Sequence, residues 1–405
     1  MFSKFFQNNF QINELFRLKN EIENKIKLEN LNKKSNLKII DLTESNPTKC
    51  DFDYSAYNLN ALFSNKNNYN YRPSPNGTEE LRESVKKYYE QRFKNSFSKI
   101  RFFKDNLFFT SGTSESYSHI FRLFCNPGDN ILIPSPGYPL IFYLAQINSF
   151  KIKYYNIKYR DNHWDIDYNS LKSKLNKKTK CIVAINPNNP TGNYLRKDDI
   201  EKLINTCQIN NLPLIIDEVF FDYNFNFNSE LTINLFQEHN IPIFILNGLS
   251  KLVAMPQMKL GWIYFTANIS MVDKIREKLE FICDTYLTVN TPIINATPEI
   301  LKSGKIIQHQ IKERISKNLN HLLNIEKNNE KFKILNYEGG WYAILKLKKN
   351  IDDDKFAIEL LKEKNIFIYP GYFYDFKKSG FIVVSLIIPE IDFKKGIEGI
   401  LQLLN

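Results

Sequence analysis

The sequence is poor in the residues that mark metal sites and disulfide frameworks. It has five cysteines and five histidines among 405 residues, and the histidines are scattered singly. The cysteines follow no metal or disulfide spacing. Cys125, Cys181 and Cys207 lie in apolar runs, as reduced core thiols do, while Cys50 and Cys283 stand alone. We therefore expect no metal site and no disulfide framework, and reduced thiols favour a cytoplasmic location.

Long apolar runs are also missing. No stretch is long enough to span a membrane, and the first residues, MFSKFFQNNFQINELF, contain no signal-peptide core. We expect no membrane-spanning segment. Internal repeats and long linkers are absent as well, and 405 residues are enough for a large core shared between two domains.

Positive charge is in excess, because 55 Lys and Arg against 44 Asp and Glu give a net charge of +11. A basic balance is typical of nucleic-acid or membrane partners when the charges gather in one region. Here they are spread along the whole chain among Asn, Ile and Phe, which favours a coding bias over a nucleic-acid footprint. We expect no nucleic-acid partner.

Short apolar runs of the β-strand type follow one another between residues 106 and 265. They are NLFFT (106–110), NILIP (130–134), KIKYY (151–155), KCIVAI (180–185), LPLIID (212–217), IPIFILN (241–247) and KLGWIYF (259–265). Stretches of helical length, such as 114–125 and 197–209, separate several of them. This alternation predicts the α/β class, with a three-layer α/β/α large domain around a mostly parallel sheet.

The remaining segments predict a smaller α+β domain. Residues 11–32 carry apolar side chains at helical spacing, and residues from about 300 to 405 mix helix-like with strand-like pieces. We expect the large domain at residues 49–297, and the small domain at residues 1–48 and 298–405.

Polar or glycine-containing stretches follow five of the strand-like runs. They are 111–113, 135–138, 186–192, 217–218 and 248–251. Open parallel sheets bind ligands beyond the carboxyl ends of their strands, so these stretches are expected to form one composite site. A lysine at a buried strand end, such as Lys251, can lose its proton and form a Schiff base with a carbonyl. Pyridoxal phosphate is the common electron sink for such chemistry.

The motifs NPNNPTG, IIDEVFFDY and LSK, with a basic residue eight positions after the LSK lysine, stand in one order along the chain. In this set and order they resemble the class I and II aminotransferases, which are fold-type I enzymes that use pyridoxal phosphate. The resemblance extends over nearly the whole chain. It implies an aminotransferase that moves an amino group from an L-amino acid to a 2-oxo acid.

By this resemblance, Lys251 is the Schiff-base lysine and later the base that moves a proton, and Asp217 pairs with the ring nitrogen of the cofactor. Asn189 would donate to the ring's O3′ while also serving the turn in which it lies. Tyr138 would stack on the ring, unless it is an ordinary core aromatic.

The resemblance implies a phosphate site at a strand-to-helix turn, whose backbone N–H groups suit an anion and also suit plain helix capping. The turn comprises Ser111, Gly112 and Thr113. Ser250 would add a hydroxyl or only cap a helix. Tyr71 resembles the tyrosine that reaches the phosphate from the neighbouring subunit, which implies a homodimer, although Tyr71 stands one residue farther from Gly77 than usual.

Three positions near the cofactor depart from the family pattern. Lys259 replaces the usual phosphate arginine, which keeps the charge but loses the bidentate fork. Gly248 lacks the serine hydroxyl that is common there. Phe220 stands in place of a tyrosine, which removes one hydrogen bond to O3′.

A fourth departure concerns the substrate. The strand GFIVVSLIIP has Val383 where the family carries the arginine that binds the substrate carboxylate. Removing one partner of such a pair costs about 2–5 kcal/mol, so another group must bind the carboxylate or the substrate is unusual. Candidates are Arg72, Asn189 and the loop 43–48 that contains Ser45.

Aromatic side chains are a further part of the expected substrate side. Trp341, Tyr342 and Tyr372 are candidates to line it, and each fits the core equally well.

Two other functions remain open on the same sequence. A lyase or decarboxylase would keep the fold and cofactor but break another bond, and the missing arginine favours that alternative. A non-catalytic binding protein would keep the fold alone, although Lys251 and Asp217 are both present.

Overall fold

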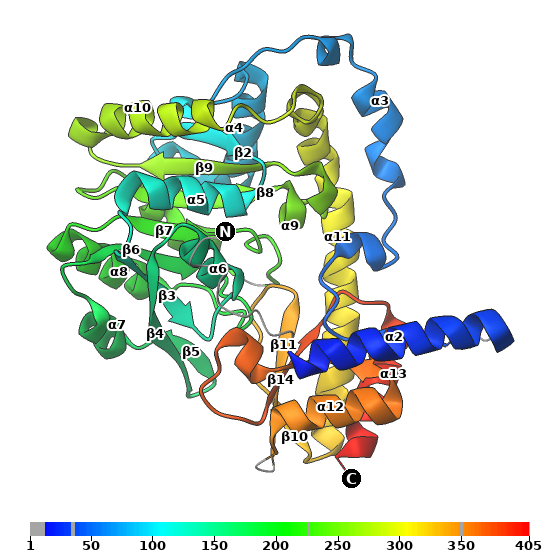
Figure 1. Ribbon diagram of the computed structural model, residues 1–405. Coiled ribbons are helices and arrows are strands. Elements are labelled where there is room, and N and C mark those ends of the chain that lie inside the picture. Colours follow the sequence, from blue (N-terminus) through cyan, green and yellow to red (C-terminus); the bar gives the residue numbers. More distant parts are fainter. Residues whose placement is uncertain (1–12, 34–36, 226, 349–350, 405) are drawn as a thin grey trace, which may run out of the picture. The chain divides into compact units, whose positions relative to one another are not determined.

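The computed structural model describes residues 13–33, 37–225, 227–348 and 351–404 (Figure 1). It divides into two compact units. The large unit comprises Asp53–Gln310 and Glu338–Gly340, and the small unit comprises Met1–Phe52, Ile311–Tyr337 and Trp341–Asn405. Residues 1–12 lie outside the described residues. They include the first two residues of the helix expected at 11–32 and most of the N-terminal stretch in which no signal-peptide core is expected. The boundaries expected from the sequence, 49–297 for the large domain, remain a prediction.

The large unit is built on an eight-stranded sheet of order β2-β9-β8-β7-β6-β3-β4-β5. Strands β4, β3, β6, β7 and β8 are mutually parallel, while β9 runs antiparallel to both of its neighbours. The strands are β2 (Leu107–Thr110), β3 (Asn130–Ser135), β4 (Lys151–Arg160), β5 (His163–Ile166), β6 (Thr179–Ile185), β7 (Leu214–Asp217), β8 (Ile243–Gly248) and β9 (Gly261–Thr266). All seven apolar runs therefore form strands, as the sequence predicts.

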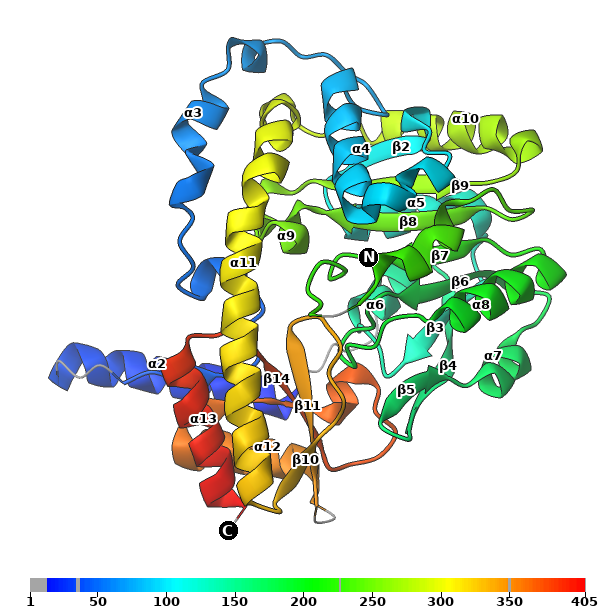
Figure 2. The same cartoon turned by 180° about the vertical axis from the view of Figure 1, so that it is seen from behind.

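Helices cover both faces of this sheet (Figures 1 and 2). One face carries α5 (Thr113–Phe124), α6 (Leu140–Ile147) and α10 (Ile269–Thr285), whose apolar side chains form one buried cluster with the sheet. The opposite face carries α4 (Glu79–Phe93) and α8 (Lys197–Asn210), and α7 (Tyr168–Lys174) packs on β4. The strands are buried on both faces, which is why they read as continuous apolar runs. The predicted three-layer α/β/α architecture is confirmed.

The small unit mixes helices with mostly antiparallel strands. Its main sheet has the order β10-β11-β14-β13, and a parallel pair joins β1 to β12. The strands are β1 (Ile40–Asp41), β10 (Phe332–Ile334), β11 (Tyr342–Leu347), β12 (Ile366–Phe367), β13 (Tyr369–Pro370) and β14 (Phe381–Ser385). The helices are α2 (Glu14–Lys33), α12 (Asp353–Lys364) and α13 (Glu390–Leu403). The division between the units falls within α11 (Thr291–Asn328).

Short helices complete the described chain. The remaining α-helices are α3 (Leu59–Phe63) and α9 (Leu249–Leu252). The 3-10 helices are η1 (Pro47–Lys49), η2 (Ser55–Tyr57), η3 (Lys66–Tyr69), η4 (Lys94–Lys99), η5 (Lys104–Asn106), η6 (Ser229–Phe236), η7 (Pro256–Met258) and η8 (Gly371–Tyr374). Of these, α9 matters most for function, because it continues directly from the end of β8 and carries Lys251.

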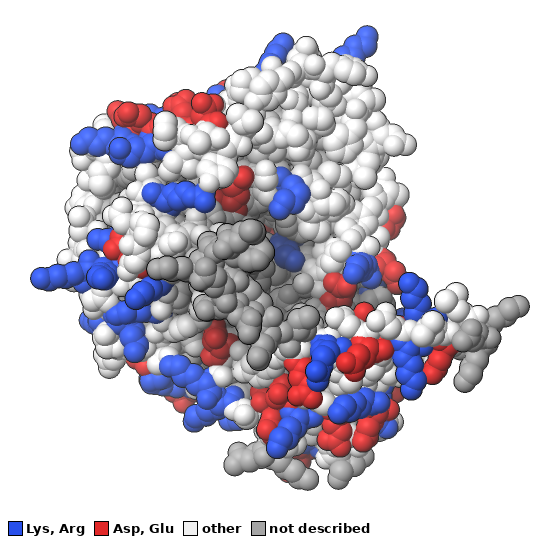
Figure 3. All heavy atoms as spheres, viewed as in Figure 1, with Lys and Arg blue, Asp and Glu red and all other residues white. Residues whose placement is uncertain are grey.

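Several chemical features follow from the composition. All five cysteines are buried free thiols. In the part of the chain that the structure describes, no helix combines the length and apolar character needed to cross a membrane, and no group of three or more His, Cys, Asp or Glu is placed to hold a metal ion. On the face shown in Figure 3, Lys and Arg side chains are spread widely, many of them next to acidic side chains.

Candidate active site

Glycines bring three segments of the large unit into close contact at one edge of the sheet. Gly248, the last residue of β8, pairs with Gly261, the first residue of β9. A Cβ atom on Gly248 would lie 2.7 Å from the carbonyl oxygen of Leu260, and one on Gly261 would lie 2.9 Å from the backbone nitrogen of Thr113. Side chains at either position would force the backbone apart. The departure at Gly248 therefore has a steric reason, because the usual serine would not fit this backbone unchanged.

The turn before α5 is the expected phosphate site. Gly112 has φ of 109°, a conformation that favours glycine, and the Nζ atom of Lys259 lies 3.7 Å from the position of a Cβ on Gly112. The backbone N–H of Ser111 donates to the Glu115 carboxylate at 2.6 Å. That N–H is therefore already occupied, and the features of the turn that fit an anionic phosphate group are the nearby Lys259 amine and the helix N-terminus.

Asp217 ends β7 and is only 4% exposed. The Tyr117 hydroxyl donates to its Oδ2 atom at 2.9 Å, and the backbone N–H of Val219 donates to its Oδ1 atom at 3.1 Å. Burial raises the pKa of Asp217 from its ordinary value of 3.8 to about 6, against the two hydrogen bonds, which lower the pKa. A desolvated carboxylate of this kind is stabilised by a cation placed beside it, so the site fits a protonated pyridine nitrogen.

The raised pKa gives a prediction for cofactor-free protein. Native Asp217 keeps its proton between about pH 4 and about pH 6, where the unfolded chain has lost it, so this residue's contribution to the free energy of unfolding falls as pH rises through that window. The expected loss is about 3 kcal/mol. Across this range, the free energy of unfolding of Asp217→Asn, measured with denaturant, should fall less, or rise more, with increasing pH than that of the unmodified protein. The exposed control Asp198→Asn should keep the original slope, and equal slopes for all three proteins would contradict the prediction.

The loop 186–192 is held close to the Tyr138 turn. The Nδ2 atom of Asn188 donates to the carbonyl oxygen of Pro136 at 3.1 Å and to the Thr191 hydroxyl at 2.7 Å. Asn189 is buried, and its Oδ1 atom has no hydrogen-bond partner among the described protein atoms. An unpaired buried acceptor fits contact with a donor on a bound group, whereas the expected donation to O3′ would have to come from the Nδ2 group of Asn189.

Lys251 lies in α9, immediately beyond the end of β8. Its Nζ atom is 5.6 Å from the centre of the Phe220 ring, so the residue that replaces the family tyrosine faces the lysine amine. The Tyr223 hydroxyl donates to the backbone carbonyl of Lys251 at 2.7 Å and fixes the helix without using the lysine side chain. Because β8 is the neighbour of β7, Lys251 and Asp217 follow adjacent strand ends.

The other predicted residues are distributed as follows. Tyr138 is exposed just after the end of β3, and Ser250 lies in α9. Tyr71 and Arg72 lie in an exposed segment before α4, where the Tyr71 side chain is 65% exposed. Ser45, Trp341 and Val383 belong to the small unit, where Trp341 and Val383 are buried. Val383 pairs across the sheet with Ile344 and Tyr369. Their roles in substrate binding remain predictions.

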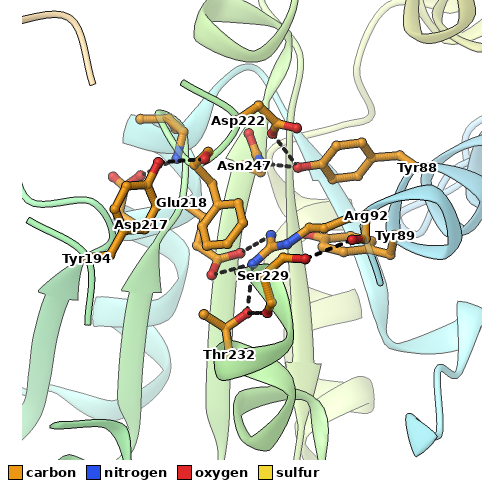
Figure 4. A network of polar contacts seen from close by, with 12 residues as sticks. Tyr88, Tyr89, Arg92, Tyr194, Asp217, Glu218, Asp222, Ser229, Thr232 and Asn247 are labelled. Atoms are coloured by element: carbon orange, nitrogen blue, oxygen red, sulfur yellow. Dashed lines mark hydrogen bonds and ion pairs between the residues drawn. The ribbon is translucent and has the colours of Figure 1, made fainter. Parts of the chain in front are cut away.

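Sequence reasoning missed two residues that contact Asp217 or the neighbouring Glu218. Tyr117 is one, and the other is Arg92, which forms a bidentate ion pair with Glu218 at 2.6 Å and 3.0 Å (Figure 4). Arg92 and Glu218 are 3% and 0% exposed, and Arg92 also donates to the Thr232 hydroxyl at 3.2 Å. In the sequence, Arg92 is only a basic residue near the end of a helix. Nothing there identifies its partner Glu218, which is 126 residues away.

Comparison with known proteins agrees with this geometry. The family model for aminotransferase class I and II matches residues 37–390. The chain belongs to the class I and II aminotransferase family. Members of this family use pyridoxal phosphate, and the lysine, the buried carboxylate and the turn before α5 fit that cofactor.

Two curated relatives carry names for different reactions. Nicotianamine aminotransferase 1 of Oryza sativa subsp. japonica is 28% identical over 66% of this chain and 56% of the rice protein. The S-alkyl-thiohydroximate lyase of Arabidopsis thaliana is 25% identical over 66% of this chain and 59% of that protein. This chain thus spans little more than half the length of these relatives.

A solved structure shows the same fold. The alanine aminotransferase from Pyrococcus furiosus has a TM-score of 0.86 at 21% identity, covering 100% of this chain and 99% of that chain. At this identity the likeness concerns the fold.

Proposed function

We propose that this chain is an aminotransferase that moves an amino group from an L-amino acid to a 2-oxo acid with pyridoxal phosphate as its cofactor. The observation that carries the proposal is the placement of Lys251, Asp217, Lys259 and the turn 111–113 beyond strand ends of a single sheet, in a chain of this family. The cofactor, when bound, supplies an aldehyde that condenses with amines and a ring that withdraws electrons from the attached carbon.

The large unit supplies the proposed catalytic groups. The Nζ atom of Lys251 would hold the cofactor and would then act as the base that takes the proton from the substrate α-carbon. Asp217 stabilises the protonated ring nitrogen, and the Asn189 amide donates to O3′. Tyr138, which is exposed at the strand end, stacks on the ring face.

The phosphate is proposed to bind at the start of α5. The backbone N–H groups of that turn and the positive end of the helix suit its charge, and Lys259 adds a cation. Ser250 adds a hydroxyl from α9. The turn residues are Ser111, Gly112 and Thr113.

The proposal extends to assembly and substrate. We infer a homodimer in which Tyr71, 65% exposed in the chain described here, contacts the phosphate in the neighbouring subunit. Arg72 and Asn189 are proposed to bind the substrate carboxylate, since Val383 cannot. Roles for Ser45 and Trp341, and a cytoplasmic location, stay predictions from the sequence.

The test is the absorption spectrum of the purified protein with pyridoxal phosphate, followed by addition of each common amino acid in turn. A yellow band should form, and certain amino acids should convert it to the spectrum of the amine form of the cofactor while releasing a 2-oxo acid. Addition of a second 2-oxo acid should restore the yellow band. A band that no amino acid converts would count against transamination.

A second candidate is a lyase that eliminates a group from the β-carbon of an amino acid. The buried Val383 in place of the usual arginine favours it, as does similarity to a relative named as a lyase. Release of pyruvate and ammonia from cysteine without any amino acceptor would support the lyase. If no pyruvate and ammonia are released, while amino acids still convert the cofactor spectrum, the aminotransferase is favoured.

A further inference from the structure

Tyr117 makes a contact that the proposed roles above do not include. Its ring is buried in the cluster between α5 and the sheet, and its hydroxyl donates to the Oδ2 atom of Asp217 at 2.9 Å. The other carboxylate oxygen accepts the backbone N–H of Val219. Each oxygen of Asp217 therefore has one fixed protein donor, which holds the plane of the carboxylate in one orientation.

The location of Tyr117 connects two parts of the site. It lies on α5 four residues after Thr113, so one helix carries both the expected phosphate turn at its start and the donor to Asp217 one turn later. A helix shift that misplaces one of these groups misplaces the other as well.

The charged and titratable groups around Asp217 come from several elements. Glu218 follows it directly and raises its pKa by like-charge repulsion, although Arg92 from α4 pairs with Glu218. Tyr138, after the end of β3, and Tyr155, on β4, disfavour ionisation of the Tyr117 hydroxyl and thereby raise its pKa. Lys251 follows the neighbouring strand β8. From α5, the Tyr117 hydroxyl donates a hydrogen bond directly to the carboxylate.

We propose that Tyr117 is a positioning residue for Asp217, whose hydroxyl keeps the carboxylate ionised and oriented for the ring nitrogen of pyridoxal phosphate. A phenolic donor is neutral, so it stabilises the ionised carboxylate without competing as a cation for the ring nitrogen. A lysine or arginine in its place would neutralise the Asp217 carboxylate, which would then no longer stabilise a proton on the ring nitrogen. The inference rests on the proposed function in that it takes pyridoxal phosphate as the ligand of Asp217.

The test is the pH dependence of the dissociation constant for pyridoxal phosphate, measured by fluorescence quenching of cofactor-free protein between pH 5 and 8.5. Affinity should fall as pH falls through the pKa of Asp217. In Tyr117→Phe, that pKa rises because the hydrogen bond that lowers it is lost, so the midpoint should move up by about one pH unit. Near pH 7 the variant should bind the cofactor about twofold more weakly, and near pH 5, below both midpoints, about tenfold more weakly.

A matched control separates this effect from the loss of any buried hydroxyl. The Tyr168 hydroxyl also donates to an aspartate, contacting the carbonyl oxygen of Asp199 at 3.0 Å and its carboxylate at 3.2 Å. Tyr168→Phe should keep the midpoint of the unmodified protein. Melting temperatures of the cofactor-free proteins show whether Tyr117→Phe is folded, and Tyr117→Leu should give the same midpoint if the hydroxyl, rather than the ring, carries the effect.

The outcomes distinguish the two proposals. If the unmodified protein binds pyridoxal phosphate and the folded Tyr117→Phe protein shows an unchanged midpoint, Tyr117 is only a packing residue and the inference is wrong. If the unmodified protein binds no pyridoxal phosphate at any pH, the proposed function falls and the inference falls with it.

Discussion

Replacement of Lys251 with alanine is expected to abolish turnover of amino acids. The variant loses the amine that holds the cofactor and the base that moves the substrate proton. Proton transfer by a positioned side chain alone contributes about 10²- to 10⁴-fold to a rate, so the total loss should reach at least that range. The measurement is the steady-state rate of 2-oxo acid formation, with the donors that convert the cofactor spectrum, together with the yellow band, which should be missing.

The structure gives a reason to expect that this variant folds. Lys251 is held through its backbone carbonyl by the Tyr223 hydroxyl, and alanine preserves both that contact and the helix. Lys197→Ala, at an exposed lysine in α8, is the matched control and should keep full activity. Robust turnover by Lys251→Ala would show that the chemistry does not depend on this lysine.

Replacement of Arg92 with methionine is expected to lower the free energy of unfolding by about 3–5 kcal/mol. Methionine keeps the bulk of the side chain but leaves the Glu218 carboxylate buried without its cation, and removal of one partner of a buried pair typically costs this much. The guanidinium also lies 3.3 Å from the centre of the Phe221 ring, so its replacement removes a stacking contact. Denaturant unfolding of the cofactor-free protein measures the loss.

The double variant Arg92→Met with Glu218→Gln tests the cause of that loss. It should recover much of the stability, because the amide carries no charge that needs a partner. Lys197→Met, which removes the cation of the exposed pair between Lys197 and Glu201, should change stability little. An Arg92→Met protein as stable as the unmodified one would mean that the buried pair contributes nothing.

Glu218 connects the proposed cofactor carboxylate, Asp217, with the buried ion pair that Arg92 forms. Its carboxylate lies next to Asp217 and raises the pKa of that residue, and Arg92 compensates its charge. The network in Figure 4 therefore does more than stabilise the fold. It lets two consecutive carboxylates occur at one buried strand end, with the second neutralised so that the first is available to a ligand.

The sequence predicted the sheet because its strands are buried on both faces. A run such as IPIFIL (241–246) is apolar throughout because helices cover both sides of the sheet, and this signal is local. The composite site followed from the same argument, since polar stretches after parallel strands must meet at one edge. The local signal did not give the antiparallel direction of β9, which depends on its pairing with β8 and β2.

Contacts between distant segments could not be predicted. Tyr117 and Asp217 are 100 residues apart, and their hydrogen bond depends on how α5 packs on the sheet. From sequence, Tyr117 is one of several aromatic residues on an amphipathic helix. Trp341 could not be placed from the sequence either, because a position on the substrate side and a position in the core were equally compatible with it, and its side chain is fully buried.

The close approach of Gly248 to Gly261 bears on how this protein can change by mutation. A hydroxyl cannot be restored at position 248 by one substitution, because the opposing strand occupies the space that its side chain needs. Residues 248 and 261 therefore form a linked pair: a larger residue at 248 requires the first residues of β9 to move away from β8, and one at 261 requires them to move away from the start of α5. What looks like a change in cofactor chemistry at position 248 is set by the spacing of two neighbouring strands.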